Sequence, residues 1–259
     1  MASEVAHDLR TIRAQLRALA NPAIAAHATR FFKTGSGEYG DGDQFLGIRV
    51  PVLRRVAREH RDASAATMFA LLRSPLHEER LLALLLLVAA FKRADERGRE
   101  RIYRGYVRAI RRYVNNWDLV DTSAPDIVGQ FLEHGSREPL RALARSGNLW
   151  ERRVAILATF WFIRRNDFAD TLAIAELLLE DEHDLIHKAV GWMLRETGNR
   201  DAKAAARFLD RHSSVMPRTM LRYAIEKLAP ARRRAYLEGS TLKRSRSGAA
   251  ARRRRPARA

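Results

Sequence analysis

The sequence has no cysteine, and this absence excludes several kinds of protein at once. Without cysteine there is no disulfide framework, no thiolate zinc site and no cysteine nucleophile. The first twenty residues mix charged and apolar positions and contain no signal-peptide core. The longest apolar run, Leu81 to Phe91, is shorter than the roughly 20 residues that cross a bilayer. We therefore expect a soluble, intracellular protein with no membrane partner.

Acidic residues are scarce relative to basic ones, with 30 Asp and Glu against 48 Lys and Arg, for a net charge of +18. Residues 231–259 contain eleven Lys and Arg and one acid, and the rest of the chain still has 37 basic and 29 acidic side chains. Such an excess attracts polyanions through salt-dependent binding. Nucleic acid is the favoured partner, and the alternative is a basic tail that only keeps the protein in solution.

The alternation of apolar and polar residues typical of strands is also missing, whereas apolar residues spaced three to four apart occur in nearly every segment. Turn-forming pairs such as Asn21-Pro22, Asn115-Asn116 and Gly198-Asn199 separate these segments. The pattern predicts thirteen helices, at about 4–20, 23–33, 52–60, 64–73, 76–93, 96–114, 117–133, 138–145, 149–165, 169–180, 184–197, 202–212 and 218–238.

Short connections between so many helices predict an all-α fold of antiparallel pairs stacked into a curved superhelix. The pairs recur about every 35–45 residues, the spacing of HEAT-like repeats. We expect one HEAT-like domain over residues 1–239 and a basic, disordered tail over 240–259. A monomer is the default expectation.

Two short motifs fit familiar ligand sites only in part. Residues 35–40 match G-x-G-x-x-G, but a predicted helix precedes them and the acidic pair Asp41 and Asp43 follows, so nucleotide binding is disfavoured. His183 and His187 would share a zinc ion only if a third ligand followed at a suitable spacing, and none does. We predict no metal and no cofactor.

One predicted helix, 184–197, carries a tryptophan away from its apolar stripe. On a helical wheel Trp192 points about 130° from the centre of that stripe, with Lys188 and Arg195 on its side. An aromatic ring between two cations suits a ligand-binding surface. The alternative is that Trp192 packs against a neighbouring repeat.

Two further helices carry polar groups that packing explains poorly. Trp117 and Asp121 are four residues apart and therefore share one face of their helix. A carboxylate beside an aromatic ring is suited to a developing cation, unless Asp121 pairs with an arginine. Arg153 lies in a helix that is apolar almost all round, so its charge needs an acidic partner or a phosphate.

Together these segments resemble the DNA alkylation repair glycosylases of the AlkD type, which are built from HEAT-like repeats. The resemblance rests on three tryptophan-bearing segments, 116–121, 148–155 and 188–196, and on residues 45–51, which look like the entry to the family's second repeat. It spans residues 20 to 230. Two departures are Asp184 and Leu185 where an aromatic is expected, and a long Gly-rich loop at 34–44.

The resemblance implies that Asp121 is the catalytic carboxylate and that Trp117 and Trp192 line the cleft beside it. It also implies DNA binding by Arg153 and, further from the motifs, by Phe31. The cations near these motifs are expected to contact DNA as well: Arg152, Lys188 and Arg195.

The expected function is a monofunctional glycosylase that hydrolyses the N-glycosidic bond of cationic purines, such as 3-methyladenine and 7-methylguanine, in double-stranded DNA. The resemblance implies base excision repair without base flipping, in a bacterial cytoplasm near the nucleoid. The alternatives are a non-catalytic helical-repeat protein that binds damaged or branched DNA, and a repeat scaffold for protein partners.

Overall fold

The computed structural model describes residues 2–239, and within them the fold is all-helical, as the sequence predicts. The described residues form no strand, and the single strand-like contact is an isolated bridge between Gln44 and Leu76. None of the described helices is long and apolar enough to cross a membrane. The predicted tail at 240–259 lies outside the described residues.

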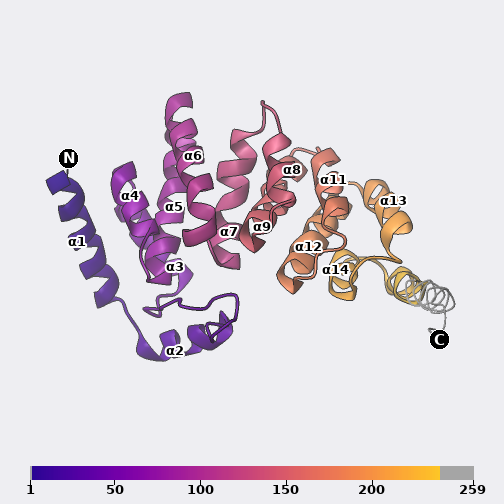
Figure 1. The fold of residues 1–259 in the computed structure, drawn as a ribbon, viewed down its shortest axis with the longest axis horizontal. Coiled ribbons are helices and arrows are strands. Elements are labelled where there is room, and N and C mark those ends of the chain that lie inside the picture. The colour runs from indigo at the N-terminus through magenta and orange to yellow at the C-terminus, as the bar shows by residue number, and fades with distance from the viewer. Residues whose placement is uncertain (1, 240–259) are drawn as a thin grey trace, which may run out of the picture. The chain divides into compact units, whose positions relative to one another are not determined.

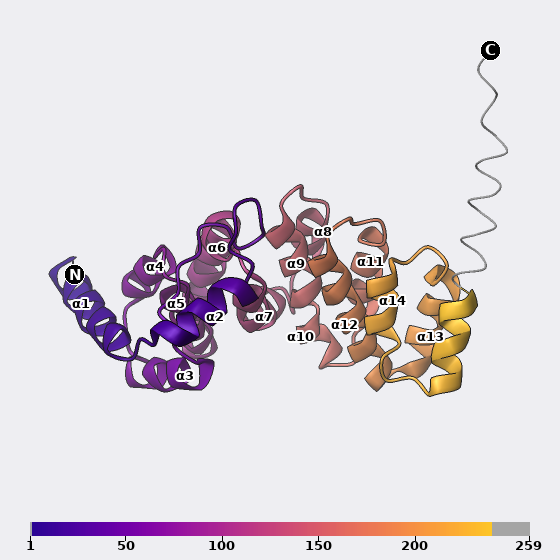
Figure 2. The ribbon, with the colours of Figure 1, turned by 90° about the horizontal axis from the view of Figure 1, so that it is seen from below.

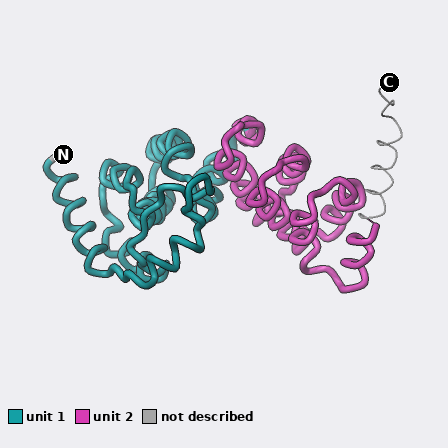
Figure 3. Tube along the Cα trace, turned by 60° about the horizontal axis from the view of Figure 1, so that its bottom comes forward, with its two compact units in different colours: residues 1–136 teal, residues 137–259 magenta. Residues whose placement is uncertain are grey.

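The chain divides into two compact units, residues 1–136 and 137–259, coloured separately in Figure 3. Whether they act as one domain stays a prediction. The first unit contains α1 (Ala2–Ala18), α2 (Pro22–Phe31), α3 (Val50–Glu59), α4 (Ala65–Leu72), α5 (His77–Arg93), α6 (Glu96–Tyr113), α7 (Trp117–Ala124) and a π-helical turn, η1 (Pro125–Gly129).

Helix α5 is the centre of the first unit. Its apolar residues 81–87 are all buried, because α3, α4, α6 and α7 pack around it. The long apolar run of the sequence is therefore a core helix covered on most sides. Helix α2 and the 32–49 segment after it lie alongside this group (Figures 1 and 2).

The start of α5 is polar and nevertheless buried. The side chains of residues 77–80 all bind other parts of the unit. Glu78 accepts hydrogen bonds from the backbone N–H groups of residues 46–48, and Glu79 pairs with Arg13 at 3.0 Å. Gly47 also lies against the start of α2: its φ is +80°, and a Cβ there would lie 2.1 Å from the Asn21 carbonyl oxygen. The bonds to Glu78 fix the 32–49 segment against α5, and the Glu79 pair fixes α1.

The second unit is organised around α12, which packs against five of its other helices. Its described helices are α8 (Glu138–Ala144), α9 (Leu149–Ala158), α10 (Phe160–Ile163), α11 (Ala169–Leu177), α12 (Asp184–Arg200), α13 (Ala202–His212) and α14 (Arg218–Ala224). A further helical segment covers 230–239.

Three of the predicted helices are interrupted. The segment 117–133 changes to a π-helical turn at Pro125, which has no N–H for the carbonyl of Asp121. The segment 149–165 breaks at Thr159, whose hydroxyl donates to the Ile156 carbonyl. The segment 218–238 breaks before Pro230, because a residue preceding proline disfavours helical geometry.

Candidate functional site

Helix α7 presents Trp117 and Asp121 on one face. The helix begins where the Asn116 side chain accepts a hydrogen bond from the backbone N–H of Trp117, at 2.8 Å. Leu119 and Val120 are fully buried, whereas Trp117 and Asp121 are partly exposed. The cap and the apolar side of this short helix therefore direct the ring and the carboxylate, one turn apart, toward its exposed side.

The ring of Trp117 packs against aromatic side chains at the C-terminal end of α2. Phe32 stacks on Trp117, with ring centroids 5.5 Å apart and an interplanar angle of 22°, and Phe31 meets it edge-on at 6.0 Å. Phe31 is 56% exposed, so it extends the aromatic surface toward solvent. The sequence-predicted Phe31 and Trp117 are thus brought into contact.

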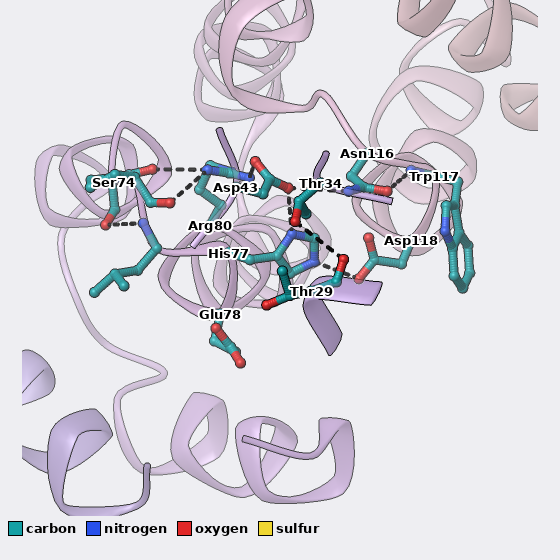
Figure 4. A network of polar contacts seen from close by, with 12 residues as sticks. Thr29, Thr34, Asp43, Ser74, His77, Glu78, Arg80, Asn116, Trp117 and Asp118 are labelled. Carbon is teal, nitrogen blue, oxygen red and sulfur yellow. Dashed lines mark hydrogen bonds and ion pairs between the residues drawn. The ribbon is translucent and has the colours of Figure 1, made fainter. Parts of the chain in front are cut away.

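Behind this aromatic surface lies a buried polar group that we call the His77 network, made of Asp43, His77, Arg80, Asn116 and Asp118 (Figure 4). The imidazole of His77 lies 3.0 Å from Asp43 through Nδ1 and 2.8 Å from Asp118 through Nε2. Arg80 and Asn116 both donate to Asp43, at 2.5 and 3.1 Å. The network ties the Gly-rich loop, α5 and the start of α7 together.

The network carries balanced charges. Burial alone would lower the pKa of His77, but the charge of Asp118 and hydrogen bonds to Asp118 and Asp43 raise it to about 9. Burial would raise the pKa of Asp43, yet the hydrogen bond from His77 and the charge of Arg80 hold it below its ordinary value. At neutral pH two cations therefore face two carboxylates.

His77 also belongs to the aromatic surface. Its ring stacks on Phe45 at 4.7 Å and lies 4.9 Å from Phe32, the same ring that supports Trp117. An imidazolium against aromatic faces gains cation–π attraction. The side chain therefore joins the charged network to the aromatic contacts of Trp117.

The charge of Asp121 acts on a buried tyrosine of α6. Tyr106 is fully buried and its hydroxyl is 2.9 Å from Ser123 Oγ. Burial raises the pKa of Tyr106, the hydrogen bond with Ser123 lowers it, and the charge of Asp121 raises it further. The Tyr106 phenol is therefore protonated at neutral pH.

In the second unit Trp192 lies on α12 and is partly exposed, as its position off the apolar stripe predicts. Its indole N–H donates to Glu196 Oε1 at 3.0 Å, and its ring lies 5.9 Å from Phe160. The Arg164 guanidinium lies 4.6 Å from the Phe160 ring centre. Phe160, at the start of α10, gives Trp192 an aromatic neighbour that the sequence motifs did not indicate.

Gly191, next to Trp192, is required by helix packing. A Cβ at this position would lie 2.5 Å from both the Met220 carbonyl oxygen and the Cβ of Tyr223. Helix α14 can approach α12 closely only because residue 191 has no side chain. This contact fixes the part of α12 that carries Trp192.

The cations of this unit that were predicted to bind DNA already have protein partners. Arg153 is buried and donates to the Leu185 carbonyl oxygen. The others form ion pairs: Arg152 with Asp181 at 2.6 Å, Lys188 with Asp184 at 2.6 Å, and Arg195 with Glu226. A phosphate would have to replace or join these carboxylates, and DNA contact by these residues stays a prediction.

The two histidines of the 183–187 motif serve local structure. His183 caps α12 by accepting a hydrogen bond from the Leu185 N–H, and His187 bonds the Asp181 carbonyl oxygen. Over residues 2–239, no group of three or more His, Asp or Glu side chains is arranged to hold a metal ion.

Comparison with known proteins adds three findings. The sequence model of the family described as "DNA alkylation repair enzyme" matches residues 12–228. A search of curated proteins finds no match. Among solved structures, a predicted DNA alkylation repair enzyme from Enterococcus faecalis is similar, with a TM-score of 0.64 at 18% sequence identity, over 82% of this chain and 97% of that one. This structural similarity supports the helical-repeat fold.

Proposed function

This chain belongs to the DNA alkylation repair enzyme family, and from that premise we propose that it is a DNA glycosylase that releases cationic N-alkylated purines from duplex DNA. The observation that carries the proposal is the exposed side of α7. There Trp117, supported by Phe31 and Phe32, shares a helix face with Asp121.

Alkylation at a ring nitrogen makes a purine cationic and therefore a good leaving group. The N-glycosidic bond breaks with its electron pair going to the base, which leaves neutral, and positive charge develops on the deoxyribose. A water molecule then adds to C1′ and gives up a proton. No protonation of the base is needed, so one carboxylate and a site that shields the sugar are sufficient.

Asp121 would stabilise the developing sugar cation and orient the water. Two unit charges about 4 Å apart attract by about 4 kcal/mol at an effective dielectric of 20. That corresponds to roughly a thousandfold in rate. The face of Trp117 would add a cation–π attraction of about 1–2 kcal/mol.

The second unit carries the other residues that the family resemblance assigns to DNA. We propose that Trp192 contacts the damaged nucleotide and that Arg153, together with Arg152, Lys188 and Arg195, helps to hold the DNA backbone. Phosphate contacts of this kind position DNA without reading its sequence. In keeping with the family resemblance, the base would be excised while it remains near the stack.

The test is release of 7-methylguanine from duplex DNA by the wild-type protein and by Asp121→Asn. The matched control is Asp62→Asn, which removes the same charge from a carboxylate that is 84% exposed. We expect base release by the wild type and the control, and about a thousandfold slower release by Asp121→Asn with its DNA binding retained. Salt-sensitive DNA binding without release by any of the proteins would instead support a non-catalytic DNA-binding repeat, and no DNA affinity would support a protein scaffold.

A further inference from the structure

Helices α4 and α6 line a hollow that is separate from the surface that carries Trp117 and Asp121. Its volume is about 360 Å³. None of its lining residues belongs to α2, α7 or the 32–49 segment. In Figure 1, α4 and α6 lie away from α2. The residues that line it are Ala66, Phe69, Leu72, Arg73, Arg101, Gly105, Arg108, Ala109 and Tyr113.

The charge around this hollow is of one sign. Arg73, Arg101 and Arg108 are exposed, and no acidic residue lines the hollow. Within residues 2–239 none of these three guanidinium groups forms a hydrogen bond or an ion pair. By contrast Arg104, on the same helix, is paired with Glu100 at 2.6 Å. Unpaired like charges repel each other, and a bound anion would relieve that repulsion.

The floor of the hollow is apolar. Leu72 and Ala109 are buried, and the ring of Phe69 is partly exposed. Gly105 admits this ring against α6, because a Cβ there would lie 2.3 Å from Phe69 Cζ. Small-molecule sites are typically hollows of roughly 300–1,000 Å³ with apolar walls and a few polar groups. The α4–α6 hollow has a volume in this range, an apolar floor and a few charged side chains around it.

From this arrangement we propose that the α4–α6 hollow binds a nucleotide, with its phosphate on the arginines and its base on the Phe69 side. Guanidinium groups match phosphate oxygens in paired hydrogen bonds. Any of the bases can stack on an aromatic side chain, so this contact does not depend on the base. The same chemistry is offered by a free nucleotide and by a nucleotide of a single DNA strand, and the experiment distinguishes the two.

The experiment measures binding of deoxyadenosine monophosphate, inorganic phosphate and a single-stranded DNA 10-mer by isothermal titration calorimetry. The variants are Arg101→Ala and Arg108→Ala, and Arg104→Ala is the control on the same helix. We expect each of the first two to weaken nucleotide binding about tenfold or more, the value of a hydrogen bond to a charged group. The control should stay within about twofold, since Arg104 does not line the hollow.

Tight binding of the mononucleotide supports a free nucleotide as ligand, and binding of the 10-mer alone supports a strand. The proposal is overturned if neither binds, if Arg104→Ala loses as much affinity as the others, or if inorganic phosphate binds as tightly as the mononucleotide. The measurement involves no reaction, so it is read independently of glycosylase activity.

Discussion

Replacing His77 by glutamine would leave Asp43 and Asp118 without the imidazolium that lies between them, inside a network that is otherwise closed by Arg80. His77 is only 2% exposed, so water would not take over its role. Removing one partner of a buried ion pair typically costs about 3–5 kcal/mol, because the other charge stays buried. We expect His77→Gln to be folded at low temperature but clearly less stable than the wild type.

The charge on His77 also makes the free energy of unfolding depend on pH. The pKa of His77 is raised from 6.5 to about 9 on folding, so the folded state holds a proton that the unfolded chain releases between these values. The contribution of His77 to the free energy of unfolding is fully present below pH 6.5 and is lost as the pH rises through 9. The free energy of unfolding should fall by about 1.4 kcal/mol per pH unit over this window, or about 3 kcal/mol in total.

The assay is urea unfolding at several pH values between 6 and 10, on the wild type and on His77→Gln. The difference between the two slopes isolates the contribution of His77 from those of other titrating groups. His134→Gln is the control, since its side chain is 92% exposed. Equal slopes for wild type and His77→Gln, or a wild type whose stability does not fall above pH 6.5, would refute the proposed charge on His77.

Two further predictions concern the support of the aromatic surfaces. Phe31→Ala should weaken binding of lesion-bearing duplex DNA by a few-fold to a hundredfold, measured by fluorescence anisotropy, because one stacking contact is worth about 1–3 kcal/mol. The melting temperature should change little, because Phe31 is 56% exposed. Unchanged affinity would remove Phe31 from the DNA surface. Gly191→Ala should lower the free energy of unfolding by about 1–3 kcal/mol and shift the emission of Trp192, because the added methyl overlaps Met220 and Tyr223. Gly147→Ala, with no atom within 4 Å of the added methyl, is its control, and equal stability of the two variants would contradict the packing argument.

The helices could be predicted because their signals are local. Asn116 caps α7 as its sequence position indicates, and the apolar run Leu81 to Phe91 is a buried helix. The partly exposed position of Trp192 follows from the helical wheel alone. Two of the three interrupted helices had a proline within a longer apolar pattern, Pro125 or Pro230, and the third breaks at Thr159.

The His77 network could not be predicted in the same way. Its hydrogen-bonded partners lie between 34 and 73 residues apart, and a single sequence holds no sign of which acid meets which base over such distances. From the sequence, Asp43 indicates only that the Gly-rich motif is unsuited to nucleotide binding. One signal was present: residues 77–80, His-Glu-Glu-Arg, directly precede the most apolar segment of the chain, and charged side chains there must find buried partners.

The two tryptophans assigned to the site are held by different means. Trp117 is stacked on Phe32 and tied, through the first turn of its helix, to a buried network of four charged groups and a capping asparagine. Trp192 has one aromatic neighbour, Phe160, and one hydrogen bond, to Glu196. Electrostatic catalysis depends on groups that are already fixed before the charge develops. The contacts that hold the face of α7 therefore suit the reacting centre that we propose there, and Trp192 is held by fewer contacts.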